Sequence, residues 1–306
     1  MGILCVSVDL DEIRCYHEIH GLDPDVVPSG VIYERAVPRI ARFFSDRGIG
    51  ATFFAVGRDL RTSGAAQAIR GLAADGHEIS NHTMNHRYDL TLLPSQEQEE
   101  EIRGGAEAIR AVTGAAPPGF RAPGYNVHLG LLDLVRDAGH SYDSSVFPCP
   151  SYMAAKAAAM GWKRLRGNPS RSILGDPRIL LAPNMPYRLG RDGVWTRGDG
   201  LCELPITVVT PARLPFIGTS ISLMGRRIAR VISRSAARMG FVNLELHGID
   251  FIDAAGDGLS HLEEYQPDLR ISLGNKTEAI GAVIDVMLDS GMQAMTLEEA
   301  STRVFV

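Results

Sequence analysis

The stretch GHEISNHTMNH, residues 76–86, lies where a predicted helix ends and a short strand and a polar segment follow. Gly76 is typical of a helix C-terminus, and the HEIS run after it predicts a strand. His77 stands at the start of that strand and is interpreted as structural. His82 and His86 come after the strand, on the side where it ends. A helix, a strand and a polar strand end in this order form one unit of an alternating α/β chain.

The same alternation extends outward from this stretch in both directions. Strands that alternate with helices predict a parallel sheet, open or closed into a barrel, that binds ligands at the C-terminal ends of its strands. The predicted strands are 3–9, 51–57, 77–80, 119–122, a segment near Tyr142, 201–209, 241–248 and 293–296. The predicted helices are 33–48, 62–75, 95–113, 129–138 and 276–290, with Ser95 and Gln98 as a capping box.

Length, composition and net charge are those of a globular protein. The chain has 306 residues, of which 45% are hydrophobic, and its formal net charge is -5. These values predict one globular domain over residues 1–306, without the basic field that attracts nucleic acid. The alternation loosens over residues 149–200, which are rich in proline, glycine and arginine and predict an insertion or lid.

Cysteine usage and the N-terminus bear on cellular location. The four cysteines are scattered, without zinc-ribbon spacing, and predict free thiols in a reducing compartment. The N-terminal run MGILCVSVDLDE lacks the basic region of a signal peptide. No run of ~20 apolar residues, the length that spans a bilayer, occurs in the chain. We therefore expect a cytoplasmic protein.

Polar side chains gather where the predicted strands end. Asp9 and Asp11 end the first strand, and alternate residues of an extended chain point to one face. Two carboxylates placed together raise each other's pKa unless a cation separates them. A solvated strand end with an N-cap aspartate is the structural alternative. Arg121, near the end of the strand at 119–122, is expected on the same rim.

The pair His82 and His86 indicates a candidate metal site on this rim. If residues 82–86 begin a helical turn, the rings of His82 and His86 lie on one face. Two histidines and one carboxylate form a typical site for zinc or another divalent ion, whereas a chance surface pair is the alternative. The sequence contains no G-x-S-x-G elbow, no phosphate-binding P-loop and no G-x-G-x-x-G after a strand.

Six segments in a fixed order resemble a known family. They are SVDLDE (7–12), ATFFAVG (51–57), GHEISNHTMNH (76–86), FRAPGY (120–125), YDSS (142–145) and LELHG (244–248). Together they resemble the polysaccharide deacetylase (NodB homology) family, carbohydrate esterase family four, over nearly the whole chain. The resemblance implies a distorted (β/α) barrel with about seven parallel strands and one divalent metal ion, most often zinc.

The resemblance also implies roles for residues on the rim. Carried over by position, the metal ligands would be Asp11, His82 and His86. Asp9 would be the general base that takes a proton from the attacking water. Arg121 would pair with Asp9 and keep it ionised and oriented. The structural alternative for Arg121 is a helix cap or a surface ion pair.

Four further residues complete the implied site. The backbone near Gly124 and Tyr125 would stabilise the oxyanion, together with the metal. His247 would protonate the leaving amine, and Asp143 would hold His247 in its cationic form. The alternatives are a simple turn at residues 123–124, a core histidine at 247 and a turn residue at 143.

The first motif departs from that of the secreted members, in which adjacent aspartates precede a glycine. Here Leu10 separates the two aspartates and Glu12 follows, a form that resembles the cytoplasmic branches of the family. The implied activity is removal of an N-acyl group, acetyl or formyl, from an amino sugar that is lipid- or polymer-linked. A metal-independent ureide (allantoin-type) amidohydrolase and a catalytically inactive carbohydrate-binding barrel are the alternatives.

A basic stripe lies in residues 214–240. Arg226, Arg230, Arg234 and Arg238 recur every four residues, beside apolar positions such as Ile228 and Val231. Such a helix can lie on an anionic membrane or bind a lipid phosphate, which would place the protein peripherally at the inner membrane face. The alternative is an amphipathic helix packed on the barrel, with a solvated basic face.

Overall fold

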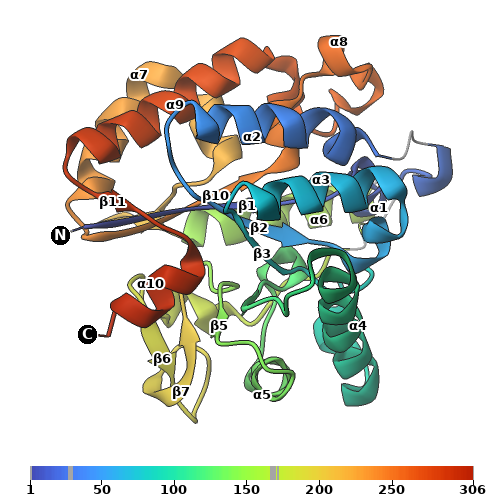
Figure 1. Ribbon diagram of the computed structural model, residues 1–306, viewed down its shortest axis with the longest axis vertical. Coiled ribbons are helices and arrows are strands. Elements are labelled where there is room, and N and C mark those ends of the chain that lie inside the picture. The colour runs from blue at the N-terminus through green and yellow to red at the C-terminus, as the bar shows by residue number, and fades with distance from the viewer. Residues whose placement is uncertain (1, 27–29, 166–169, 171, 306) are drawn as a thin grey trace.

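The computed structural model describes residues 2–26, 30–165, 170 and 172–305 (Figure 1). In the described part of the chain, parallel strands run in the order β10-β1-β2-β3-β4-β5-β7. Strand β6 joins the end of this sheet antiparallel to β7, and β11 pairs with the start of β1. The curled sheet is the distorted (β/α) barrel with about seven parallel strands that the sequence predicted.

The strands have the following bounds: β1 (Ile3–Asp9), β2 (Thr52–Ala55), β3 (Glu78–Asn81), β4 (Gly119–Phe120), β5 (Tyr142–Asp143), β6 (Tyr187–Leu189), β7 (Arg197–Glu203), β8 (Val208–Val209), β9 (Leu214–Pro215), β10 (Phe241–His247) and β11 (Gln293–Ala294). The helices are α1 (Ile13–His20), α2 (Val37–Ser45), α3 (Ser63–Ala74), α4 (Ser95–Thr113), α5 (Leu129–Asp137), α6 (Pro150–Leu165), α7 (Gly218–Ala237), α8 (Ala254–Asp257), α9 (Leu273–Asp289) and α10 (Leu297–Arg303).

A segment without regular structure closes the barrel between its two ends. The Leu204 N–H donates to the carbonyl of Asp143 in β5, at 2.9 Å. The Thr207 N–H donates to the carbonyl of Asn243 in β10, at 3.1 Å. Residues 204–207 therefore stand in for a strand and bring β5 and β10 to the same enclosed interior.

Alternate residues of β1 face opposite environments, as the period of two in a strand requires. Leu4, Val6 and Val8 belong to the core cluster that packs against the surrounding helices. On the other face, Cys5 packs with apolar side chains near the N-terminal end of the barrel. Ser7 and Asp9 continue that inward face toward the opposite end, so the interior changes from apolar to charged along one strand.

The helices cover the outside of the sheet in two groups (Figure 1). Helices α2, α3 and α9 bury their apolar faces against β1, β2 and β10. Helices α4 and α5 pack with β4 in a second cluster. Both groups leave the C-terminal ends of the strands free of helix packing, which is where a barrel of this kind carries its ligand site.

The structure corrects the expected capping box, and it shows which elements residues 149–200 form. Helix α4 begins at Ser95 as predicted, but Ser95 and Gln98 form no capping box. Pro94 occupies the cap position, and the Gln98 side-chain amide donates to the Leu93 carbonyl at 2.8 Å. The segment 149–200 contains helix α6 and also the β6–β7 pair, so part of it extends the sheet. Its role as an insertion or lid stays a prediction.

In the described residues, no helix combines the length and the apolar character needed to cross a bilayer. Helix α7, which carries the arginine stripe, packs on α9 and β10 through small residues such as Ala229, Ser233 and Ala236. The four arginines of the stripe are exposed, as are Ile228 and Val231. The helix is thus both packed on the barrel and amphipathic toward solvent.

Candidate metal centre and active site

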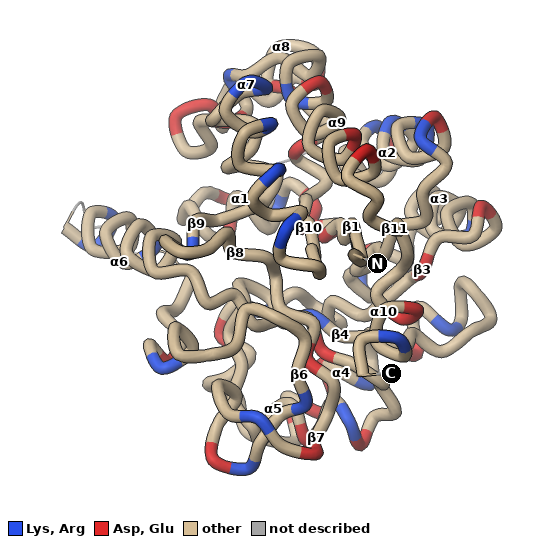
Figure 2. Tube along the Cα trace, turned by 90° about the vertical axis from the view of Figure 1, so that its left-hand side faces the viewer, with Lys and Arg blue, Asp and Glu red and all other residues tan. Residues whose placement is uncertain are grey.

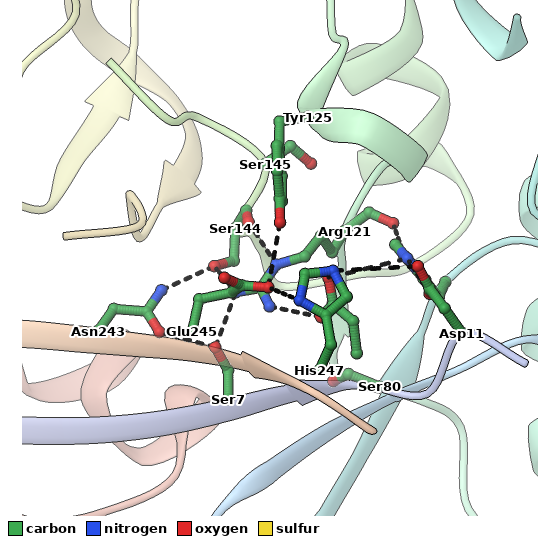
Figure 3. A network of polar contacts seen from close by, with 12 residues as sticks. Ser7, Asp11, Ser80, Arg121, Tyr125, Ser144, Ser145, Asn243, Glu245 and His247 are labelled. Carbon is green, nitrogen blue, oxygen red and sulfur yellow. Dashed lines mark hydrogen bonds and ion pairs between the residues drawn. The ribbon is translucent and has the colours of Figure 1, made fainter. Parts of the chain in front are cut away.

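The strand order brings distant residues to one rim. Asp9 and His247 are register partners at the C-terminal ends of β1 and β10. His82 directly follows β3, and Arg121 directly follows β4. Because the carboxyl ends of parallel strands meet at one end of a barrel, these four side chains converge, although Asp9 and His247 are 238 positions apart in the sequence. Figure 3 shows part of this network.

Three donors on the rim point at a common centre. Asp11 Oδ1 lies 3.3 Å from His82 Nε2 and 3.1 Å from His86 Nε2. All three residues are buried, and their donor atoms lie within 4.8 Å of one another. The second nitrogen of His82, Nδ1, is 2.7 Å from the Arg121 carbonyl. A carbonyl only accepts, so this Nδ1 carries the hydrogen and the Nε2 lone pair faces Asp11.

This donor set fits a divalent cation. Asp11 Oδ1 and both ring nitrogens of His86 are buried without a hydrogen-bond partner among the described residues. Although burial alone would raise the pKa of Asp11, the nearby His86 and His82 hold that pKa well below its ordinary value. Buried polar atoms without partners are costly, and a cation between them removes that cost. Two imidazoles and one carboxylate with open positions are ligands typical of zinc and similar ions.

The spacing of the two histidines arises from a tight turn. Residues 82–86 are not helical, so the predicted helical turn is wrong. Thr83 and His86 have φ values of 66° and 55°, and the Thr83 hydroxyl accepts from the His86 N–H at 3.0 Å. Helix α4 approaches this turn through Gly105. A Cβ there would overlap Asn81 Oδ1 and lie 2.7 Å from the Thr83 carbonyl carbon.

Arg121 fixes the orientation of Asp9. Its Nη1 donates to Asp9 Oδ1 at 2.6 Å, while Nη2 donates to the hydroxyls of Ser7 and Ser144. Its Nε donates to the Ser144 carbonyl, and its guanidinium stacks over the Phe54 ring. Although burial lowers the pKa of Arg121, the neighbouring Asp9 raises it above its ordinary value. A permanently charged and fully engaged guanidinium therefore holds one oxygen of Asp9 and leaves the other, Oδ2, toward the cavity.

His247 has a buried acidic partner in its own strand. Its Nδ1 lies 2.8 Å from Glu245 Oε1, which also accepts from the Tyr125 hydroxyl at 3.0 Å (Figure 3). Burial alone would lower the pKa of His247, but Glu245 raises it well above its ordinary value. The other ring nitrogen, Nε2, faces Asp9 Oδ2 at 4.0 Å and Asp11 Oδ2 at 3.9 Å. The charged form of His247 is thus favoured, and its Nε2 faces the carboxylates of Asp9 and Asp11.

A cavity of about 300 Å³ opens over these groups. Asp9, Asp11, His82 and His247 lie at its floor. Its walls are mainly aromatic and apolar, formed by Tyr16, Tyr88, Tyr125, Tyr152, Ile217 and Ile249, and they also include the polar residues Thr219, Ser220 and Gln266. Aromatic walls over a few convergent polar groups are typical of a pocket for a small organic ligand, and rings of this kind present flat apolar faces to it.

Known proteins resemble this chain in part of its sequence and in its fold. Residues 25–142 match the polysaccharide deacetylase family. Over 97% of the chain, the fold matches a Mycobacterium smegmatis protein classed with the polysaccharide deacetylases, with a TM-score of 0.55, 18% sequence identity and 94% of that chain covered. The fold of a family 4 carbohydrate esterase from Streptomyces lividans matches 98% of this chain and 95% of that one, with a TM-score of 0.50 at 12% identity.

The chain is similar to the polysaccharide deacetylase family in the sequence of residues 25–142 and in its fold. A peptidoglycan deacetylase of Helicobacter pylori is 25% identical over 147 residues, which are 47% of this chain and 49% of that protein. A chitooligosaccharide deacetylase of a Bradyrhizobium species is 34% identical over 87 residues, which are 28% of this chain and 38% of that protein. The chain therefore spans less than half the length of each of these two relatives.

The predicted partner of His247 is wrong. Asp143 does not hold His247, because its carboxylate accepts from the N–H and the hydroxyl of Ser145 and shares a hydrogen bond with the buried Glu203. Burial raises the pKa of Asp143 above its ordinary value. Glu245 takes the place beside His247. The signal was present in the LELHG motif, because residues two apart on a strand share a face.

The structure also shows where the predicted residues Gly124, Tyr125 and His77 lie. Gly124 and Tyr125 line the cavity in left-handed backbone conformations, with φ values of 64° and 62°. The Tyr125 N–H already donates to the Ala122 carbonyl, so the oxyanion role of this segment stays a prediction. His77 is structural, as interpreted from the sequence. Its Nδ1 accepts from the Ala51 N–H at 3.1 Å, and its ring packs beside that of Phe53.

Glu245→Gln is expected to move the alkaline limb of the kcat–pH profile to lower pH. Without the carboxylate, the pKa of His247 falls, and the protonated form is lost at a lower pH. At alkaline pH, kcat should then fall by up to the ~10²–10⁴-fold that general acid catalysis contributes. The profile is measured beside that of Glu278→Gln, a change on the exposed face of α9. An alkaline limb that stays in place would contradict the role of Glu245.

Proposed function

We propose that this protein is a metal-dependent amide hydrolase that removes an acetyl or formyl group from the nitrogen of an amino sugar. The observation that carries the proposal is the placement of a metal-ligating set between a carboxylate and a protonated imidazole, at the floor of one cavity. The family supports this reading, since relatives named peptidoglycan, chitooligosaccharide and chitin deacetylases share its sequence pattern.

Each residue of the site has a separate role in the proposed reaction. Asp11, His82 and His86 would hold the metal ion, for which we propose zinc. An ion bound there supplies Lewis-acid polarisation of the acyl carbonyl and lowers the pKa of the attacking water. Asp9, oriented by Arg121, accepts the proton of that water through Oδ2. His247 donates a proton from Nε2 to the departing amine, and Glu245 keeps it charged until then.

The alternatives are less well supported by the geometry. A metal-independent ureide hydrolase has no use for Asp11 and His86 as buried, unpartnered donors that converge. A purely carbohydrate-binding barrel has no use for a base and an acid on the same cavity floor. A cytoplasmic location stays a prediction, as does contact between the arginine stripe and an anionic membrane.

The test is product release by metal-free and reloaded protein. We expect purified protein loaded with zinc to release acetate or formate from N-acylated amino sugars, and a chelator to abolish the release. Reloading with zinc should restore it. Allantoin is tested in parallel. Hydrolysis of allantoin that is unaffected by chelation, with no release from amino sugars, would overturn the proposal in favour of the ureide hydrolase.

A further inference from the structure

A second cavity of about 280 Å³ adjoins the one described above. The two share Ile19, Tyr88, Gly124 and Tyr152 as lining residues, so they are contiguous. The second cavity lies between the C-terminal end of α1 and one face of helix α6. Its walls are mainly apolar, and neither the metal donors nor Asp9 nor His247 lines it.

Helix α6 is held to the protein by few contacts. It has sixteen residues, and none of the side chains described in it is buried. Figure 2 shows α6 standing out from the rest of the molecule. Its cavity face consists of Tyr152, Ala155, Lys156, Ala159, Met160 and Lys163, at the three- and four-residue steps that place side chains on one side of a helix. Two lysines thus project from an otherwise apolar helix face.

These two lysines are positively charged groups without an acidic partner. Lys156 Nζ donates to the Gly124 carbonyl at 3.1 Å, and Lys163 Nζ donates to the Ile19 carbonyl at 2.8 Å. Lys163 also donates to Nδ1 of His20 at 2.6 Å. Across the described ranges of the chain, no carboxylate lies within ion-pair distance of either lysine, whereas many of the arginines have one.

Both ammonium groups can still bind a ligand. An ammonium has three N–H donors, of which Lys156 uses one and Lys163 uses two. Burial lowers the pKa of Lys156 to about 8 and also lowers that of Lys163. An anion in the cavity would accept the spare donors and reverse the cost of burying the charges.

We propose that the second cavity is a subsite for an anionic group, a carboxylate or a phosphate, that the substrate carries beside the N-acyl group to be removed. The inference rests on the proposed function, because it takes the first cavity as the place of hydrolysis. Lys156 lies next to Gly124, which lines both cavities, and Lys163 lies two helical turns further out, ~10 Å along the axis. An anion close to the N-acyl group of the substrate would bind Lys156, and an anion further from it would bind Lys163.

Three probes of equal length test the subsite. One is a neutral oligosaccharide of N-acetylglucosamine, the second carries a carboxylate on the neighbouring sugar, and the third carries a phosphate at its reducing end. The wild-type protein should hydrolyse one of the charged probes with a kcat/KM about 10-fold above the neutral probe, mainly through KM, as a charge-assisted hydrogen bond provides. The charged probe with the higher kcat/KM shows whether the subsite prefers a carboxylate or a phosphate.

Lys156→Met and Lys163→Met should reduce that preference, the lysine nearer the anion having the larger effect. Arg164→Met, on the exposed side of the same helix, is the matched control and should keep the preference. Calorimetric binding of the charged probes to the same proteins in an Asp9→Asn background gives a readout without turnover. The same order of affinities is expected there.

The outcomes separate this inference from the proposed function. Equal kcat/KM for neutral and charged probes, or lysine variants that behave like Arg164→Met, would overturn the subsite and leave the hydrolase standing. If the metal-loaded protein hydrolyses none of the probes, the proposed function fails. The calorimetric comparison then decides the subsite alone: loss of charged-probe binding in either lysine variant supports it, and unchanged binding refutes it.

Discussion

The Asp9→Asn protein is expected to keep its metal ion and to hydrolyse substrate ~10²–10⁴-fold more slowly than the wild type. An amide at this position still accepts the hydrogen bond from Arg121 Nη1, so the fold and the ligands are preserved. It cannot take a proton from the attacking water at neutral pH, which is the function assigned to Asp9 Oδ2. The measurement is kcat on the best amino-sugar substrate, with metal content determined on the same preparation.

Asp133→Asn is the control for this change. Asp133 lies on the exposed surface of α5, away from the first cavity, and pairs only with Arg136 among the described residues. It undergoes the same chemical substitution and should keep the wild-type kcat. Full activity in Asp9→Asn would show that another group takes the proton. Loss of metal together with activity would instead place Asp9 among the ligands.

The second large effect is expected from His82→Ala, which should lose metal and activity together. The substitution removes one of three converging donors and also frees the Arg121 carbonyl that orients the ring. Loss of metal affinity should exceed the ~10–100-fold that follows when only a hydrogen-bond partner of a ligand is removed. Elemental analysis after dialysis and calorimetric titration with zinc measure it.

His77→Ala provides the comparison for this histidine. It comes from the same stretch of sequence but lies at the opposite end of β3, where its ring supports β2 through the Ala51 N–H. We expect it to lower the stability of the fold while zinc is still bound. If His82→Ala retains one equivalent of zinc with the affinity of the wild type, His82 is not a ligand.

Much of the architecture is predictable because the central strands of a parallel sheet are buried on both faces. Such strands appear as continuous apolar runs, and β1 and β10 lie where those runs predicted them. Once the strands are parallel, their polar ends must meet at one rim. The convergence of Asp9, His82 and Arg121 therefore follows from the alternation of elements, together with the position of each residue at a strand end.

The errors concern details that depend on three-dimensional contacts. The turn at His82–His86 needs left-handed conformations at Thr83 and His86, which hydrogen bonds and the approach of Gly105 stabilise and which residue preferences oppose. The partner of His247 could not be predicted, because it depended on which nearby carboxylate already had a hydrogen-bond donor. Asp143 accepts from the Ser145 hydroxyl, which leaves Glu245 as the partner of His247. The predicted strand 201–209 is interrupted, because β7 ends at Glu203 and residues 204–207 close the barrel without regular structure.

The hydrogen bonds of Arg121 have a consequence for how the site is assembled. They tie β1, through Ser7 and Asp9, to Ser144 in the segment that follows β5. The metal donors, by contrast, come from the ends of β1 and β3, with only β2 between them. We expect ion uptake to require β1, β3 and the Arg121 carbonyl that positions His82, whereas alignment of Asp9 also requires Ser144, which follows β5. In a partly opened molecule we therefore expect the protein to keep its metal ion after the alignment of Asp9, and with it the proposed activity, is lost.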